Sequence, residues 1–170
     1  AARGVPSIAS TLEELQLPAA SIPAIGLFDV IEHLEDPSAL LEECRRVLKP
    51  AGQLVVTVPA YSWLWSNADD LAGHWRRYTT GSLIAEVEES GFDVRNCSYR
   101  MASLLVPMFC ARAVPYRLGH RSKPAAVQRE LASSAGGLGR LLTTLERRAG
   151  RYLPFGTSVF AVAVPNTSGV

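Results

Sequence analysis

The stretch Leu27–Pro59 decides the fold of this chain, and it reads LFDVIEHLEDPSALLEECRRVLKPAGQLVVTVP. An apolar run ends at an acidic turn, a helical pattern follows, and a Pro/Gly break precedes a second apolar run. Strand-length apolar runs around an amphipathic helix are typical of a strand–helix–strand unit in a parallel sheet. Ligands in such sheets bind outside the carboxyl ends of the strands. We therefore expect functional residues after Phe28 and near Pro59.

The helix of this unit has a recognisable start, face and end. Asp36 is expected to cap it and Pro37 to occupy its first position. Its inward face follows the 3, 4, 7, 8 spacing of an amphipathic helix, with apolar residues at Leu40, Leu41, Cys44, Val47 and Leu48. The break Pro50–Gly52 is predicted to stop the helix, and Gln53–Val58 is predicted to be a buried strand.

Length and composition favour one domain over residues 1–170 and exclude several classes of protein. The net charge is +1, which argues against a nucleic-acid-binding protein. The three cysteines have no disulfide-framework or metal-ligand spacing, so we expect reduced thiols, a cytoplasmic location and no metal. The start of the chain has no secretory signal, and the most apolar window, Met101–Pro115, is too short for a transmembrane segment.

The segment from Ala60 to Thr80 differs from its surroundings. It contains all three tryptophans together with tyrosines, acids, a histidine and two adjacent arginines, and it shows neither helical nor strand periodicity. A loop of this length in a compact domain is usually functional, often as a lid or a binding loop.

The rest of the chain predicts further elements in order. A helix is expected over Gly81–Ser90 and a strand over Phe92–Tyr99, followed by the helical segments Met101–Tyr116 and Ala125–Arg148. The last strand is expected over Phe155–Val164. Residues 100–152 thus form a helical insertion before the final strand.

Several motifs together resemble one family. The pattern Phe28–Pro37, the Arg-Val-Leu-Lys-Pro-Ala-Gly run ending at Gly52, and Leu54–Pro59 are similar to strand four, its helix and strand five of class I methyltransferases that use S-adenosylmethionine (SAM). Further matching motifs are Gly73-His-x-Arg-Arg-Tyr-Thr79 and Glu89-Ser-Gly-Phe-Asp-Val94. The likeness is to a bacterial small-molecule branch. It implies an α/β fold with a mostly parallel, Rossmann-like sheet and flanking helices.

The resemblance also implies missing parts. The family begins with a strand and a glycine-rich turn that holds the cofactor, and both would lie upstream of Ala1. We therefore expect an N-terminally truncated chain whose open sheet edge a partner chain would cover.

Cofactor contacts are implied at two places. Thr11, Leu12 and Glu13 follow a short candidate strand, Val5–Ala9, and would contact the adenine, although a helix cap explains them equally well. The strand end Leu27–Phe28–Asp29 would meet the ammonium and sulfonium groups; the alternative for Leu27 and Phe28 is core packing.

The acceptor is expected beside the second strand end. His33 and His74 are the candidate proton-accepting groups, although a structural role is the stronger reading for His33. The candidate acceptor contacts are Tyr61, Trp65, Arg76, Arg77 and Tyr78. Paired arginines suit a carboxylate or phosphate, and the equal alternative is that Arg76 and Arg77 pair with Asp69 and Asp70.

These features predict SAM-dependent methyl transfer to a small or lipid-like acceptor. The segment Met101–Arg151 is expected to be a lid over that acceptor; the alternatives are a surface in contact with lipid, a helical pair on the sheet, or a homodimer surface. The alternative function is a truncated, non-catalytic fragment that serves as a binding or dimerisation module.

Overall fold

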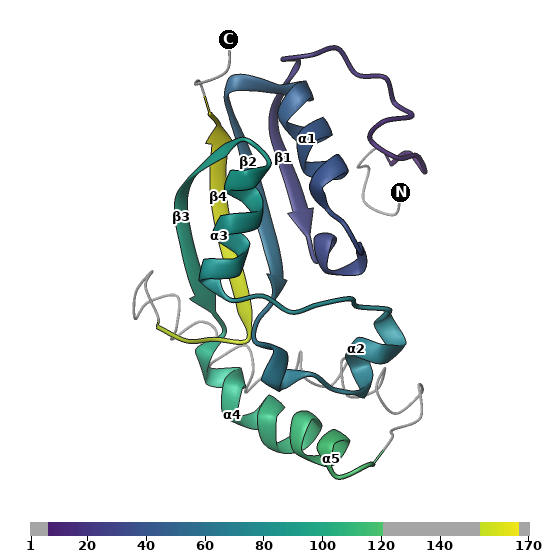
Figure 1. Ribbon diagram of the computed structural model, residues 1–170, viewed down its shortest axis with the longest axis vertical. Helices are drawn as coiled ribbons and strands as arrows, with labels where there is room; N and C mark the ends of the chain where they lie inside the picture. The colour runs from purple at the N-terminus through teal and green to yellow at the C-terminus, as the bar shows by residue number, and fades with distance from the viewer. Residues whose placement is uncertain (1–6, 121–153, 167–170) are drawn as a thin grey trace.

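A computed structural model describes residues 7–120 and 154–166, which share one four-stranded sheet in the order β1-β2-β4-β3 (Figure 1). Strands β1 (Ile22–Phe28) and β2 (Leu48–Pro59) are parallel. Strand β4 (Ser158–Pro165) runs antiparallel to both β2 and β3 (Phe92–Arg100). Strands β1, β2 and β3 therefore point the same way, which confirms the predicted α/β fold with a mostly parallel sheet.

Two helices cover the face of the sheet that is turned to the viewer in Figure 1, α1 (Ser38–Val47) and α3 (Thr80–Glu89). The carboxylate of Asp36 accepts a hydrogen bond from the Ser38 amide at 2.9 Å, but the helix begins at Ser38 with Pro37 as its N-cap, one residue later than predicted. Thr79 caps α3 through the Ser82 amide. Each helix buries one apolar stripe against the sheet, including Leu41, Cys44, Val47, Leu83 and Val87.

The predicted break at Pro50–Gly52 is wrong. Helix α1 ends at Val47, and β2 begins at the next residue, so the Pro/Gly residues lie inside the strand. The pairing with β1 explains how the strand tolerates them. Leu48 pairs with Ile22 and Gln53 pairs with Ala24, so the residues between Leu48 and Gln53 bulge out of the ladder.

The segment between β2 and α3 is more regular than the sequence predicted. It contains the short helices η2 (Ser62–Leu64) and α2 (Asn67–Ala72), and its last part returns to the sheet, where Tyr78 bridges to Ala60. A capping box formed by Ser66 and Asp69 starts α2. This segment and η1 (Ile31–His33), which follows β1, lie at the carboxyl ends of β1 and β2.

The chain after β3 is helical, as predicted. It forms η3 (Ala102–Leu104), α4 (Leu105–Met108), a π-helical turn η4 (Phe109–Ala113) and α5 (Val114–Arg117). A run of aromatic rings joins this segment to the sheet: Tyr61 stacks on both Tyr99 and Trp63, and Trp63 meets Phe109 edge to face. The helix predicted over residues 125–148 lies outside the described residues. No helix of the described part is long and apolar enough to cross a membrane.

Candidate functional site

A cavity of about 510 Å³ opens at the carboxyl ends of β1 and β2. Its polar wall comes from Asp29 and Glu32 after β1 and from His74 and Arg77 before α3. The opposite wall belongs to the helical segment after β3 and is largely apolar, with Met101, Leu104, Pro107, Met108 and Ala111. The two strand ends that the sequence singled out therefore lie beside one cavity, as expected for ligand binding in such sheets.

Asp29 follows the last residue of β1 in a conformation that is unusual for a residue with a side chain. Its φ is 54°, in the left-handed region, which Asp and Asn tolerate better than most residues. Its amide donates to the Thr57 carbonyl at 3.0 Å, so the pairing of β1 with β2 continues to this point. The strained turn turns the chain out of the sheet and leaves the Asp29 side chain at the cavity.

Glu32 is the most unusual group of the cavity wall. The residue is 0% exposed, and neither carboxylate oxygen has a hydrogen-bond partner in the described part of the chain. Burial, helped by the nearby charges of Asp29 and Asp69, raises the pKa of Glu32 to about 7, against the lowering effects of its own backbone amide and of the Arg77 charge. Such a carboxyl group is suited to accept or donate a proton near neutral pH.

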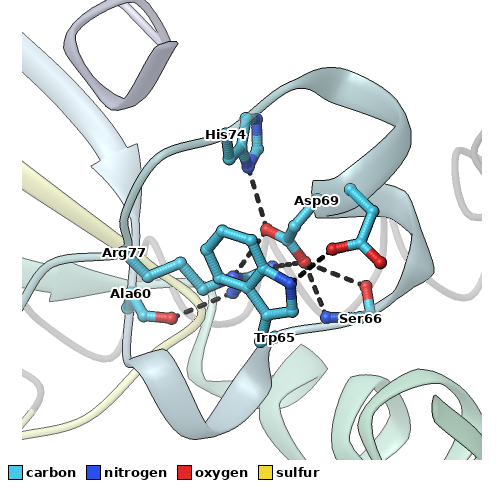
Figure 2. A network of polar contacts seen from close by, with 7 residues as sticks. Ala60, Trp65, Ser66, Asp69, His74 and Arg77 are labelled. Carbon is cyan, nitrogen blue, oxygen red and sulfur yellow. Dashed lines mark hydrogen bonds and ion pairs between the residues drawn. The ribbon is translucent and has the colours of Figure 1, made fainter. Parts of the chain in front are cut away.

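The carboxylate of Asp69 contacts two side chains of the polar wall, those of Arg77 and His74, as Figure 2 shows. It receives Nε and Nη2 of Arg77 at 2.7 and 3.0 Å, and Nδ1 of His74 lies 2.9 Å from it. The amide and hydroxyl of Ser66 also donate to it. Burial alone would raise the pKa of Asp69, but the hydrogen bonds and charge of Arg77 outweigh burial and hold this pKa below its usual value.

The guanidinium of Arg77 is engaged in hydrogen bonds within the protein and is not directed at a ligand. Its side chain is 5% exposed, and its third hydrogen bond goes from Nη1 to the carbonyl of Ala60 at 2.9 Å. The predicted pairing of Arg77 with Asp69 is thus confirmed. Arg76 does not pair with Asp70; it pairs with Glu86 at 3.6 Å and donates to the Glu35 carbonyl. Asp70 instead accepts from Nε1 of Trp65 and from the hydroxyl of Tyr116.

The candidate cofactor residues fall in two places. Asp29 lines the cavity, Leu27 is 7% exposed in the core, and Phe28 is 62% exposed on the other side of β1.

Thr11 caps a turn by accepting from the Glu14 amide, and Leu12 packs against the core. Residues 7–9 form no strand, so the short strand expected there is wrong for the part that is described. The cofactor contact of Thr11, Leu12 and Glu13 stays a prediction.

Only some of the candidate catalytic and acceptor residues lie at the cavity. His74 and Arg77 line the cavity, and the His33 ring meets the His74 ring edge to face at 4.7 Å between centroids. Tyr61 lies in the aromatic run and Tyr78 is a core residue. Neither of these, nor Trp65 or Arg76, is among the residues that line the cavity.

Sequence reasoning missed the roles of two important residues. Glu32 was visible as an acid beside a candidate histidine after a buried strand, but nothing local indicated its complete burial. Asp69 was considered only as a partner of an arginine, whereas it also holds His74. The apolar wall belongs to the segment Met101–Arg151, which was expected to cover the acceptor, and the described part of that segment lines the cavity.

Comparisons with known proteins give partial sequence matches and a matching fold. Residues 1–56 match a family model described as a methyltransferase domain. A protein from Mycolicibacterium smegmatis named "Probable S-adenosylmethionine-dependent methyltransferase" is 36% identical over 87 residues, which are 50% of this chain and 34% of that protein. A similarly named protein from Mycobacterium tuberculosis is 35% identical over 91 residues, 52% of this chain and 33% of that protein. The match thus spans about a third of the length of these relatives.

Solved structures show the fold over nearly the whole chain. A SAM-dependent methyltransferase from Thermotoga maritima superimposes with a TM-score of 0.56 at 16% identity, covering 97% of this chain and 66% of the other. One from Archaeoglobus fulgidus gives a TM-score of 0.52 at 16% identity, covering 92% and 65%. The resemblance in the motifs after β1 therefore agrees with these partial matches: this chain is similar to SAM-dependent methyltransferases over about half of its length and has the fold of that group.

Proposed function

We propose that this chain takes part in SAM-dependent methyl transfer and carries the acceptor side of the active site. The observation that supports this most strongly is the cavity at the carboxyl ends of β1 and β2, which has one polar and one apolar wall. In proteins of this fold type, ligands meet at that edge of the sheet. The names of the related proteins supply the reaction class.

The cofactor is proposed to lie along the end of β1. Asp29 faces the cavity from a left-handed turn, and a short polar side chain at this position would contact a cationic group of the cofactor. Bound SAM would supply an activated methyl group. The protein then has to hold the acceptor in line with that group and keep water out, which is a matter of position more than of covalent chemistry.

The acceptor is proposed to have an apolar body and one polar group. Its body would pack against the wall of Met101, Leu104 and Met108, while its polar group would face Glu32 and His74. A cavity of about 510 Å³ is within the ordinary size range of small-molecule sites. The apolar wall favours a small or lipid-like acceptor with an apolar body; of the two arginines that line the cavity, Arg77 is already paired with Asp69, and Arg112 comes from the helical segment after β3.

Acceptor deprotonation is proposed at the polar wall. Asp69 accepts from Nδ1 of His74, and this bond leaves Nε2 of His74 as the ring nitrogen able to take a proton. Glu32, whose pKa is about 7, lies in the same wall. A hydroxyl or amine held here would lose its proton to one of these groups as its bond to the methyl group forms.

Calorimetric titration with S-adenosylhomocysteine tests the cofactor side. We expect saturable binding by this chain, and we expect Asp29→Asn to weaken it about tenfold, since one charge-assisted contact is lost while the left-handed turn is kept. Asp93→Asn, an exposed acid in β3, is the matched control and should bind as the unchanged chain does. No heat at millimolar ligand, or equal loss in both variants, would contradict the proposal.

A further inference from the structure

The polar wall of the cavity gathers three metal-ligating side chains from two segments. One ligand atom each from Glu32, His33 and His74 lies within 4.8 Å of the other two. Glu32 and His33 belong to η1, whereas His74 comes from the segment between α2 and α3. Two imidazoles and one carboxylate are a donor set that Zn²⁺ and other divalent transition metals prefer, and Mg²⁺ favours oxygen ligands instead.

Glu32 gives an independent indication of a ligand. It is 0% exposed, it lines the cavity, and its two oxygens have no hydrogen-bond partner among the described residues. Removing a carboxylate from water without a partner is costly, so natural proteins rarely leave one in this state. A cation at this place would supply the partner that the described protein groups do not.

His74 is oriented as a metal-binding histidine would be. Nδ1 of His74 lies 2.9 Å from Oδ1 of Asp69, and this carboxylate can only accept, so Nδ1 donates and the lone pair remains on Nε2. Figure 2 shows the second ring nitrogen on the side of the imidazole away from Asp69. A carboxylate that fixes a histidine through its other nitrogen is the usual support for a metal ligand. Arg77 and Ser66 hold that carboxylate in turn.

We propose that Glu32, His33 and His74 bind one divalent transition metal, with Zn²⁺ as the best fit. Bonds of about 2.1 Å in tetrahedral geometry put ligand atoms about 3.4 Å apart, so the three side chains would close slightly on the ion. Three protein ligands leave a fourth position open toward the cavity. With the ion bound, Glu32 and His74 would be its ligands and would not take the acceptor's proton; the open position would instead hold the polar group of the acceptor and lower the pKa of that group. That role rests on the proposed function; metal binding itself does not.

The test is a titration of the chelator-treated chain with Co²⁺, without cofactor or acceptor. We expect one saturable Co²⁺ per chain, with the visible bands of a low-coordinate nitrogen and oxygen site. Glu32→Gln and His74→Gln should each weaken binding by about 10- to 100-fold, as loss of a ligand or its support does. His120→Gln is the matched control, because it is the one histidine of the sequence outside the cluster, and it should bind as the unchanged chain does.

Two results would overturn the proposal. One is the absence of saturable uptake; the other is uptake that survives Glu32→Gln and His74→Gln but is lost in His120→Gln or in cysteine variants. If Glu32→Gln unfolds the chain because Glu32 is buried, His33→Gln takes its place in the test. His33 is exposed, and its substitution should also weaken Co²⁺ binding. A failed Co²⁺ titration beside normal binding of S-adenosylhomocysteine would reject the metal site and leave the proposed function intact.

Discussion

The carboxylate of Asp69 and the guanidinium of Arg77 form a two-point ion pair in which both side chains are almost completely buried, with 1% and 5% exposure. Asp69 belongs to α2, and Arg77 lies just before α3. The pair therefore closes the segment between β2 and α3 into a loop whose inner side carries His74. The segment also buries Leu64 and Tyr78 in the core, and the ion pair adds the polar contact that fixes the position of the wall.

Breaking this pair should destabilise the chain strongly. Asp69→Asn leaves a buried arginine without its counter-ion, which typically costs about 3 kcal/mol or more of the free energy of unfolding. Urea unfolding measures this loss. The matched control is Glu43→Gln on α1, which removes the exposed ion pair between Glu43 and Arg46 and should lower stability far less. If both variants lost the same small amount, the buried pair would not be what holds the segment.

The sequence predicts the sheet better than the cavity, because the signals for the sheet are local in sequence, whereas the cavity depends on contacts between distant segments. Strand β1, helix α1 and strand β2 are encoded by apolar spacing and by Asp36 and Pro37, which are all local signals. The break at Pro50–Gly52 was misread because local turn residues also fit a bulge, and only pairing with β1 decides between them. The burial of Glu32 depends on the tertiary arrangement of segments distant in sequence, which periodicity cannot reveal.

Thiol reactivity should differ sharply among the three cysteines. Burial raises the pKa of Cys44 to about 12 and that of Cys97 to about 11, so at pH 8 only about one molecule in a thousand or fewer carries either thiolate. Cys110 is exposed on η4. We expect Ellman's reagent to modify one thiol quickly in the folded chain and all three in denaturant. Cys110→Ser should remove the fast phase, and a fast phase that persists would contradict the described packing.

Gly156 should not accept a side chain. A Cβ atom there would lie 2.1 Å from the Arg100 carbonyl oxygen, which is backbone and cannot move aside easily. Gly156 leads into Thr157, whose amide donates to that same carbonyl and which lines the cavity. Gly156→Ala is expected to cost about 2 kcal/mol or more in the free energy of unfolding, through overpacking.

The control for this substitution lies in helix α3. A Cβ atom at Gly81 would meet only the Thr79 hydroxyl, at 3.9 Å. Gly81→Ala should leave stability unchanged or raise it by up to about 1 kcal/mol, since Ala is the better helix former. Thermal unfolding of the two variants side by side gives the comparison. Equal stability of both variants would show that β4 can start without the close approach at Gly156.

Filling the cavity should abolish binding of an apolar ligand and spare the cofactor. Met108 lines the cavity from α4, whereas Val106 on the same helix is 68% exposed and is not among the lining residues. Met108→Trp is therefore expected to weaken saturable binding of an uncharged fluorescent apolar probe such as N-phenyl-1-naphthylamine by at least tenfold, or about 1.4 kcal/mol. Val106→Trp adds the same ring to the same helix outside the cavity and should bind the probe as the unchanged chain does.

The same two variants separate the acceptor side from the cofactor side. Both should bind S-adenosylhomocysteine with unchanged affinity, because the proposed cofactor contacts lie at the end of β1 and not on α4. A loss of S-adenosylhomocysteine binding in Met108→Trp, with probe binding kept, would mean that the cofactor occupies the space assigned to the acceptor. Equal probe binding by both tryptophan variants would place the apolar ligand outside the cavity, because only one of the two substitutions fills it.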